Sequence, residues 1–197
     1  MALKKKVAII TEQEYLAGEE IAENKHEFIG GEIFAMSGAS KNHERISGNV
    51  FRKFGNFLEN SSYEPFSSDI KVKIGKDFFY PDTMVVCDDQ TDHDYYTEMP
   101  TIIVEVLSKS TRRYDQTIKR IAYQSIPTLQ EYILIEQEFV DIEISKKKDT
   151  WKSRHYFLGD TFTLESIGLI VKVEDLYYRV KNEEMTDFLQ MHEQSQG

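Results

Sequence analysis

Apolar residues recur along the chain with the period of a helix in some segments and as continuous runs in others. One predicted helix begins after Ser40, which is a suitable N-cap residue, and its apolar positions lie three or four residues apart. These positions are Ile46, Val50, Phe54, Phe57 and Leu58. They share one side of a helix, so we expect that side to be buried.

Two apolar runs predict the centre of a β-sheet. Residues 83–87 contain no charged side chain, and residues 101–107 contain only Glu105. Unbroken runs of this length are typical of strands that are covered on both faces. Residues 70–74 instead alternate apolar and polar positions, which predicts a strand with one core face and one wet, partly basic face that includes Lys71 and Lys73.

The remaining pattern completes a mixed α/β (α+β) fold. Thr11 and Glu14 form a capping-box pattern that opens a short helix over residues 11–23, and Gly30 and Gly31 suit the tight turn of a hairpin. Further elements are expected as a helix capped by Ser110 or Thr111 and running to residue 124, a strand over 131–135, and an antiparallel meander over 139–145, 151–157 and 161–165. The order strand, helix, strand predicts a right-handed crossover and a parallel strand pair.

Length and composition limit the class of protein. The 197 residues, 40% of them hydrophobic and 29% charged, fit a single soluble domain over 1–197 with its core over 11–178 and a polar tail that frays over 183–197. The lone Cys87 excludes an internal disulfide and a four-cysteine zinc site, which favours the reducing cytoplasm. The basic start of the chain has too short an apolar stretch for export or a membrane anchor.

The net charge of −10 disfavours avid DNA binding by the surface as a whole. A local basic rim can still act, because charges are screened over a Debye length of roughly 8 Å. Lys71, Lys73, Lys109, Arg112, Arg113 and Arg120 are candidates for such a rim, and dispersed surface charges are the alternative.

The chemistry is expected where carboxylates interrupt the apolar strands. Asp82 precedes the run 83–87, and Glu105 lies inside the run 101–107. If the two strands are neighbours, their like charges about 4 Å apart repel by roughly 4 kcal/mol at an effective dielectric near 20. A divalent cation removes both the burial cost and the repulsion, and oxygen ligands favour Mg²⁺, with Mn²⁺ as a substitute. Lys119, in the following helix, can bring an ammonium group to a phosphate at the strand ends.

An ordered series of motifs resembles the Uma-type restriction endonuclease family, a bacterial branch of the PD-(D/E)XK nuclease superfamily. The series extends over roughly residues 11–178 and comprises Glu27 to Ile33, His43, Tyr80-Pro81-Asp82, Ile103 to Ser108, Thr111, Tyr114-Asp115, Lys119, Tyr123 and Glu131-Tyr132. The resemblance implies a restriction-endonuclease-like core with Asp82 and Glu105 as metal ligands, and with Glu27 as a further acidic residue that helps to hold the metal or its water. The superfamily's usual strand lysine falls on Leu107 here, so Lys119 takes its place.

Each candidate residue also has a purely structural interpretation. Asp82 can shape a turn, Glu105 can pair with Arg112 or Arg113, and Lys119 can form an ordinary helix ion pair with Asp115. Glu27 can be a solvated hairpin residue, and His43 can face solvent in the first turn of its helix. The acidic residues Asp88, Asp89, Asp92 and Asp94 lack the glycine and the closing glutamate of a calcium loop, so we expect a solvated loop.

These observations predict a Mg²⁺-dependent endodeoxyribonuclease that hydrolyses phosphodiester bonds in DNA with Asp82, Glu105, Lys119 and Glu27. A catalytically inactive module of the same fold, for DNA binding or assembly, is the main alternative, and hydrolysis of another phosphate ester is a weaker one. We expect a homodimer, because cutting two strands needs two sites. Candidate contact residues are Tyr95, Tyr96, Tyr177 and Tyr178.

Overall fold

The structure is a computed structural model that describes residues 10–194, with side chains described as far as Met191. The basic segment considered above for export lies mostly within residues 1–9, outside the described residues. In the described part of the chain, no helix combines the length and the apolar character that crossing a bilayer requires.

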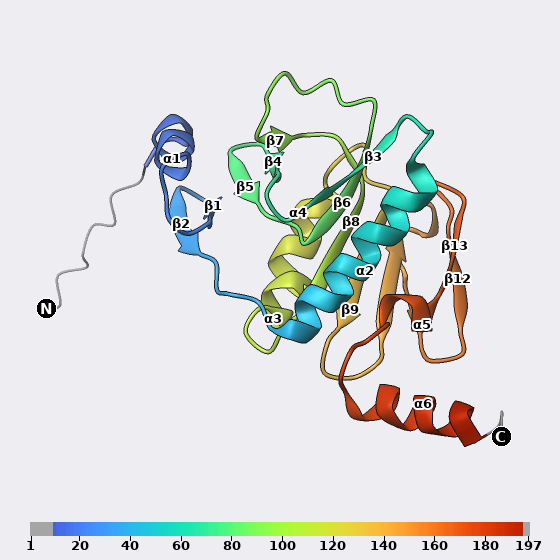
Figure 1. Ribbon diagram of the computed structural model, residues 1–197. Coiled ribbons are helices and arrows are strands. Elements are labelled where there is room, and N and C mark those ends of the chain that lie inside the picture. Colours follow the sequence, from blue (N-terminus) through green and yellow to red (C-terminus); the bar gives the residue numbers. More distant parts are fainter. Residues whose placement is uncertain (1–9, 195–197) are drawn as a thin grey trace, which may run out of the picture.

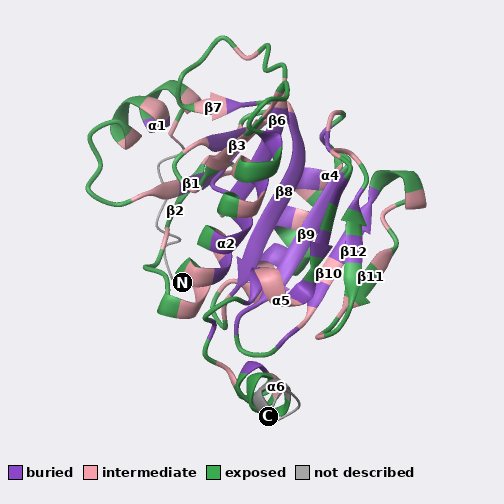
Figure 2. Ribbon diagram, turned by 45° about the vertical axis from the view of Figure 1, so that its right-hand side comes forward, coloured by how far each residue is buried: buried purple, intermediate pink, exposed green. Residues whose placement is uncertain are grey.

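A six-stranded mixed sheet forms the centre of the fold (Figure 1), in the order β11-β10-β9-β8-β6-β3. Its strands are β3 (Tyr63–Ser67), β6 (Thr83–Cys87), β8 (Pro100–Leu107), β9 (Glu131–Glu136), β10 (Ile142–Lys146) and β11 (Ser153–Tyr156). β8 and β9 are parallel, as the strand-helix-strand order predicts, and the other neighbouring pairs are antiparallel. Every residue of β8 and β9 is buried (Figure 2), which confirms that the apolar runs mark the middle of the sheet.

Two smaller sheets complete the strands. The first has the order β2-β1-β5-β4-β7 and consists of β1 (His26–Ile29), β2 (Glu32–Ala35), β4 (Lys71–Ile74), β5 (Asp77–Phe79) and β7 (Tyr96–Thr97). Its hairpin turns at Gly30 and Gly31, whose φ angles of 60° and 85° explain why the sequence has glycine there. The second is the pair β12 (Thr161–Leu164) and β13 (Leu169–Lys172).

The helices and helical turns are α1 (Glu12–Glu19), α2 (Lys41–Leu58), α3 (Arg112–Tyr114), the π-helical turn η1 (Asp115–Lys119), α4 (Arg120–Gln124), the 3-10 turn η2 (Lys147–Asp149), α5 (Val173–Leu176) and α6 (Glu183–Gln194). The predicted caps are confirmed for the first two helices: Thr11 and Glu14 form a full capping box, and the Ser40 hydroxyl accepts from the His43 N–H. The third helix is more complex than predicted. The Thr111 hydroxyl accepts from the Ser108 N–H instead of capping it, and a π turn interrupts it.

The helices cover the two faces of the central sheet with separate cores. On one face, α2 packs through Ile46, Val50, Phe54 and Leu58 against alternate sheet residues such as Val104, together with β12, β13 and α5. On the other face, Ile103 and Leu107 pack with Tyr123 of α4 and with Phe79 of the five-stranded sheet. Because β8 side chains alternate between the faces, Glu105 shares the face of Ile103 and Leu107 and points toward the helix that contains Tyr123.

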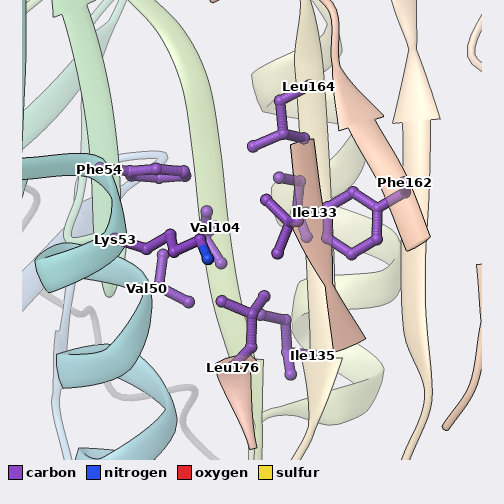
Figure 3. Close-up of a pocket in the computed structure, with 10 residues that line it drawn as sticks. Val50, Lys53, Phe54, Val104, Ile133, Ile135, Phe162, Leu164 and Leu176 are labelled. Atoms are coloured by element: carbon purple, nitrogen blue, oxygen red, sulfur yellow. The ribbon is translucent and has the colours of Figure 1, made fainter. Parts of the chain in front are cut away.

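The core beneath α2 is nearly closed. A gap of about 10 Å³ remains there, lined by apolar side chains such as Phe54, Val104 and Phe162 together with Lys53 (Figure 3). A gap of this size holds about one water molecule at most, and its apolar wall offers few polar partners. It is part of the packing, so the functional site lies elsewhere.

The structure corrects several expectations about individual elements. The first helix ends at Glu19 rather than near residue 23, and Phe57 of α2 is exposed, because it lies beside the buried stripe rather than in it. β12 does not continue the meander of β9, β10 and β11 but pairs with β13. Residues 183–194 form helix α6 instead of a frayed tail, and Met185 in its first turn is buried. Residues 195–197 lie outside the described residues.

Candidate active site

Asp82 lies immediately before β6, and Glu105 lies within the neighbouring strand β8. β6 and β8 pair antiparallel with Thr83 facing Val104, so one further step of that register places Asp82 across from Glu105. Residues directly opposite in an antiparallel pair have Cβ atoms about 4.5–5.5 Å apart. The two strands are therefore neighbours, and the two acids lie at facing positions of the pair.

Asp82 is held by two donors on the same oxygen. Its Oδ2 accepts a 2.7 Å hydrogen bond from the Val106 N–H and lies 3.2 Å from His43 Nε2. The Ser40 cap sets the start of α2 and so positions His43 in its first turn. His43 is thus a partner of the site rather than a solvated residue.

Glu105 is bonded by the helix that follows its strand. Its Oε1 accepts from Lys119 Nζ at 3.0 Å and from the Tyr123 hydroxyl at 2.9 Å. All three side chains are buried. Residues 119 and 123 are one helical turn apart, which explains why both reach the same carboxylate.

Lys119 also binds two further acids. Its Nζ lies 2.9 Å from Glu27 Oε1 of the hairpin and 3.6 Å from Asp115 Oδ1 at the start of the π turn. Glu27 Oε1 additionally accepts from the Tyr80 N–H at 3.1 Å. Three buried carboxylates therefore surround one ammonium group, and the hairpin is tied to the central sheet through that lysine.

The interpretations that the sequence left open are now decided by contacts. Arg112 pairs with Glu136, so Glu105 is not the partner of Arg112, and the charge beside it is an ammonium rather than a guanidinium. Lys119 does form the helix pair with Asp115, but its two shorter contacts are with Glu27 and Glu105. Glu27 is buried and bonded, so the solvated interpretation of this residue is wrong.

The pKa values of Glu105, Asp115 and Lys119 are all raised, as expected where buried negative charges outnumber the positive ones. Burial and the charges of Asp115, Asp82 and Glu27 raise the pKa of Glu105 well above its ordinary value, although Lys119 opposes the shift. Burial likewise raises the pKa of Asp115. Burial by itself would lower the pKa of Lys119, but the charges of Glu105, Glu27 and Asp115 raise it well above normal, so the ammonium stays protonated.

His43 responds to the same field. Its burial would lower its pKa, but the hydrogen bond and the charge of Asp82, with Glu44 and Asp115 more distant, raise it. Its Nδ1 is buried and has no hydrogen-bond partner among the described residues. The imidazole therefore directs one nitrogen at Asp82 and gains positive charge as the pH falls.

The donor set fits a hard divalent cation. Within residues 10–191, no hydrogen-bond partner occurs for Asp82 Oδ1, Glu105 Oε2 or Glu27 Oε2, so each acid is fixed through one oxygen and leaves the other open. Asp115 Oδ1 is buried without a hydrogen bond. Mg²⁺ is held by one or two carboxylates and keeps several waters, which two facing acids can satisfy.

The same part of the chain offers no ready-made cage. No group of three or more His, Cys, Asp or Glu side chains there is arranged to enclose a metal ion. The three acids Asp82, Glu105 and Glu27 are therefore not gathered as a single metal-binding group, and a metal-binding role of Asp82 and Glu105 stays a prediction. A metal-binding role of Glu27 stays a prediction, since its observed contacts are with Lys119 and the Tyr80 N–H.

Other predicted features are dispersed. Asp88, Asp89, Asp92 and Asp94 are exposed in the loop before β7, as expected for a solvated loop. Most candidate rim residues are paired with acids, as Lys73 is with Glu12, Lys109 with Glu138, Arg112 with Glu136 and Arg120 with Glu143. Lys71, predicted on a wet face, is buried against Tyr80 and Tyr95.

Two residues of the site were not identified by reasoning from the residues alone. Asp115 was considered only as a helix partner of Lys119, and Tyr123 entered only through the resemblance. The available signal was their spacing: Asp115, Lys119 and Tyr123 follow at intervals of four, which places them along one face of a helix. That face meets Glu105.

A mixed sheet with Asp82 and Glu105 beside a buried lysine of the neighbouring helix is the arrangement that the resemblance implies for a nuclease-like fold. The family described as "Uma2: Putative restriction endonuclease" matches residues 12–174. The chain therefore belongs to the Uma2 family, as its motifs predicted.

Relatives and a solved structure agree with this assignment. Two Synechocystis proteins are similar: uncharacterized protein slr1290 is 37% identical over 85% of this chain and 91% of its own length, and uncharacterized protein sll1609 is 40% identical over 71% and 81%. A crystal structure described as a putative nuclease belonging to DUF820, from Anabaena variabilis, shares the fold with a TM-score of 0.70 and 15% identity, over 85% of this chain and 97% of that one.

Proposed function

We propose that the protein is a metal-dependent endonuclease that hydrolyses phosphodiester bonds in DNA. The observation that carries the proposal is the pair Asp82 and Glu105, which lie at facing positions of β8 and the start of β6, beside the ammonium group of Lys119. Such an arrangement is costly for a protein that binds no cation, because several buried negative charges share one positive charge.

Asp82 and Glu105 would hold Mg²⁺ or, as a substitute, Mn²⁺. When bound, the ion would supply an activated water near neutral pH and would offset charge on the attacked phosphate. Glu27 would help to order the metal's surroundings. Its bond to Lys119 keeps that lysine beside Glu105.

The chain's own residues set the position and charge of the site. The Val106 N–H and His43 fix one oxygen of Asp82, and Tyr123 and Lys119 fix one oxygen of Glu105. Lys119 is the cation best placed to stabilise the non-bridging oxygens of a phosphate that reaches these carboxylates. To do so, it would exchange part of its contact with the three acids around it.

The partners follow from the same chemistry. DNA is the expected substrate and a cytoplasmic homodimer the expected form, with two sites for two strands. Tyr177 is fully buried and cannot be a dimer contact, whereas Tyr95 and Tyr178 are exposed candidates. Because most basic side chains named above are paired with acids, DNA affinity should depend strongly on the bound cation.

Plasmid cleavage with purified protein tests the proposal. Supercoiled DNA with millimolar Mg²⁺ or Mn²⁺ should be nicked or linearised by the wild type and left intact by Asp82→Asn and Glu105→Gln. Asp94→Asn is the matched control, because Asp94 is an exposed acid outside the site. The proposal would be ruled out if the wild type and both site variants cleaved the plasmid equally and a chelator abolished cleavage by none of them.

A nuclease-fold module without activity is the second candidate. The net charge of −10 and the pinning of Lys119 by three acids favour it. Calorimetric titration separates the two functions. Mg²⁺ or Mn²⁺ binding that is lost in Asp82→Ala supports the enzyme, and no binding at millimolar metal supports the module.

A further inference from the structure

A separate cavity is lined in part by Tyr80, whose backbone N–H also bonds Glu27 of the carboxylate site. It has a volume of about 380 Å³, within the range of small-molecule pockets, and it lies between the α1 end of the chain and the loop before β7. The residues that matter for its chemistry are Leu16, Glu20, Glu23, Lys71, Tyr80 and Tyr95.

Lys71 is the unusual group in this cavity. Its side chain is 5% exposed, and its Nζ lies 5.1 Å from the centre of the Tyr80 ring and 5.8 Å from that of Tyr95. These ring contacts are its only polar side-chain interactions within the described residues, and no carboxylate pairs with it there. Burial lowers its pKa, with Glu19 and Glu20 opposing the shift. A buried ammonium without an acid partner leaves hydrogen-bond donors available to a ligand.

Tyr95 supplies a flat, accessible surface next to those donors. Its side chain is 54% exposed, yet its position is fixed because the Lys71 N–H donates to the Tyr95 carbonyl at 3.1 Å and the Tyr95 N–H donates to His93 Nδ1 at 3.2 Å. An exposed ring on an anchored main chain suits stacking with a planar ligand.

The charges in the cavity exclude a simple anion site. Four carboxylates, those of Glu19, Glu20, Glu23 and Asp69, line it against the two ammonium groups of Lys25 and Lys71. A free phosphate would be repelled by this excess of acids. A neutral planar ring can stack on Tyr95. If it also carries acceptor atoms for Lys71 and amino groups for Glu20 or Glu23, it matches both kinds of polar group in the cavity.

Tyr80 connects this cavity to the carboxylate site. Its hydroxyl donates to Glu19 Oε1 at 3.0 Å in the cavity, and its backbone N–H donates to Glu27 in the site. Tyr80 and Asp82 are two residues apart, so their Cα atoms are within about 7.6 Å. This upper limit is comparable to two base steps of a DNA strand at about 3.4 Å each.

From these observations we infer that the cavity beside Lys71 and Tyr95 binds a nucleobase turned out of the nucleic-acid strand whose backbone lies at Asp82. The inference rests on the proposed function for its source of the base. The base stacks on Tyr95, accepts hydrogen bonds from Lys71, and directs its amino group toward Glu20 or Glu23. Leu16 closes the apolar side of the cavity.

The test uses full-length protein with Asp82→Asn as background, so that cleavage cannot interfere. Titration of the neutral nucleosides guanosine, adenosine, cytidine and thymidine, followed by NMR shifts of the aromatic side chains, should give saturable binding of at least one base. Tyr95→Ala should weaken it about tenfold or more, and Tyr95→Phe should retain it. Tyr178→Ala is the matched control, since Tyr178 is an equally exposed ring outside the cavity.

A second measurement compares a single-stranded oligonucleotide with the same strand bearing one abasic position. The protein that retains Tyr95 should bind the abasic strand about tenfold more weakly than the intact strand. The Tyr95→Ala variant should bind both strands equally. Lys71→Met should weaken base binding as Tyr95→Ala does. If Lys71→Met fails to fold, the comparison of Tyr95→Ala with the abasic strand still tests the inference. Absence of nucleoside binding, or equal binding by Tyr95→Ala, overturns the inference even if plasmid is cleaved. Base binding without any cleavage would retain it while the proposed function fails.

Discussion

The Asp82 carboxylate accepts its shortest hydrogen bond, 2.7 Å, from the backbone N–H of Val106. This side chain takes the place of the next main-chain partner at the point where the β6 and β8 ladder ends. Asp82 therefore has a structural role in closing the strand pair as well as its proposed role in binding an ion. The two roles can be separated by substitution.

Asp82→Asn retains an oxygen acceptor for the Val106 N–H, whereas Asp82→Ala leaves that buried donor without a partner. We expect Asp82→Ala to lower the free energy of unfolding by about 1–3 kcal/mol and Asp82→Asn to lower it by less. Urea denaturation followed by circular dichroism measures both. Equal losses in the two variants would show that the hydrogen bond is unimportant for stability.

Removal of the central cation should be severe. Lys119→Met leaves Glu27, Glu105 and Asp115 buried without an ammonium group, and we expect a loss of about 3–5 kcal/mol at pH 7. Adding Glu27→Gln to Lys119→Met should recover part of the loss, because it removes one of the unpaired charges. A double variant less stable than Lys119→Met would contradict the charge balance described here.

Metal binding should depend on pH in a defined direction. Because the pKa of Glu105 is raised, the folded protein binds the carboxyl proton of Glu105 more tightly than the unfolded chain does. Without metal, the contribution of Glu105 to the free energy of unfolding therefore falls as the pH rises from about 4.5 through the raised pKa. A cation replaces that proton. Magnesium should therefore raise the melting temperature more at pH 8 than at pH 5.5.

Differential scanning fluorimetry with and without Mg²⁺ measures this increment, and Asp82→Asn should abolish it at both pH values. The same increment in Asp94→Asn and wild type serves as the control for nonspecific ion effects. A magnesium-induced rise in melting temperature that is larger at pH 5.5 than at pH 8 would be inconsistent with carboxylate ligands.

Lys71 should affect stability in the alkaline range. Its folded pKa is lowered from 10.5 by burial, so the unfolded chain binds the proton more tightly, and its contribution to stability rises with pH between the lowered folded pKa and about 10.5. The free energy of unfolding of the wild type relative to Lys71→Met should increase from pH 7 to pH 10. A constant difference across that interval would mean that the ammonium is not desolvated.

Local signals in the sequence predicted much of this architecture. The capping box at Thr11, the glycine pair of the hairpin and the Ser40 cap each depend on a few neighbouring residues, and all three occur as expected. The meeting of Asp82 with Glu105 was also predictable, because a charged residue in an apolar run requires a partner nearby.

Other features depend on contacts between distant segments and carry no local signal. Lys71 alternates with apolar residues as a surface residue would, and it is buried only because Tyr80 and Tyr95 close over it. Tyr177 is likewise adjacent to an exposed tyrosine in the sequence but fully buried in the fold. The separation of β12 from the meander is determined by its partner β13, whose position no local pattern specifies.

The π-helical turn over Asp115–Lys119 has an effect on how the site tolerates insertion and deletion. A π turn contains about one residue more than an α turn, and each residue of an α-helix contributes a rotation of about 100°. Loss of a single residue here would let the segment rewind as ordinary helix and would change the direction in which its acidic and basic side chains point toward the sheet. The segment would still look helical by any measure of content, while the contacts of Lys119 with the acids around it changed. The helical register of this one turn therefore determines which contacts Lys119 makes with Glu105, on a strand formed elsewhere in the chain.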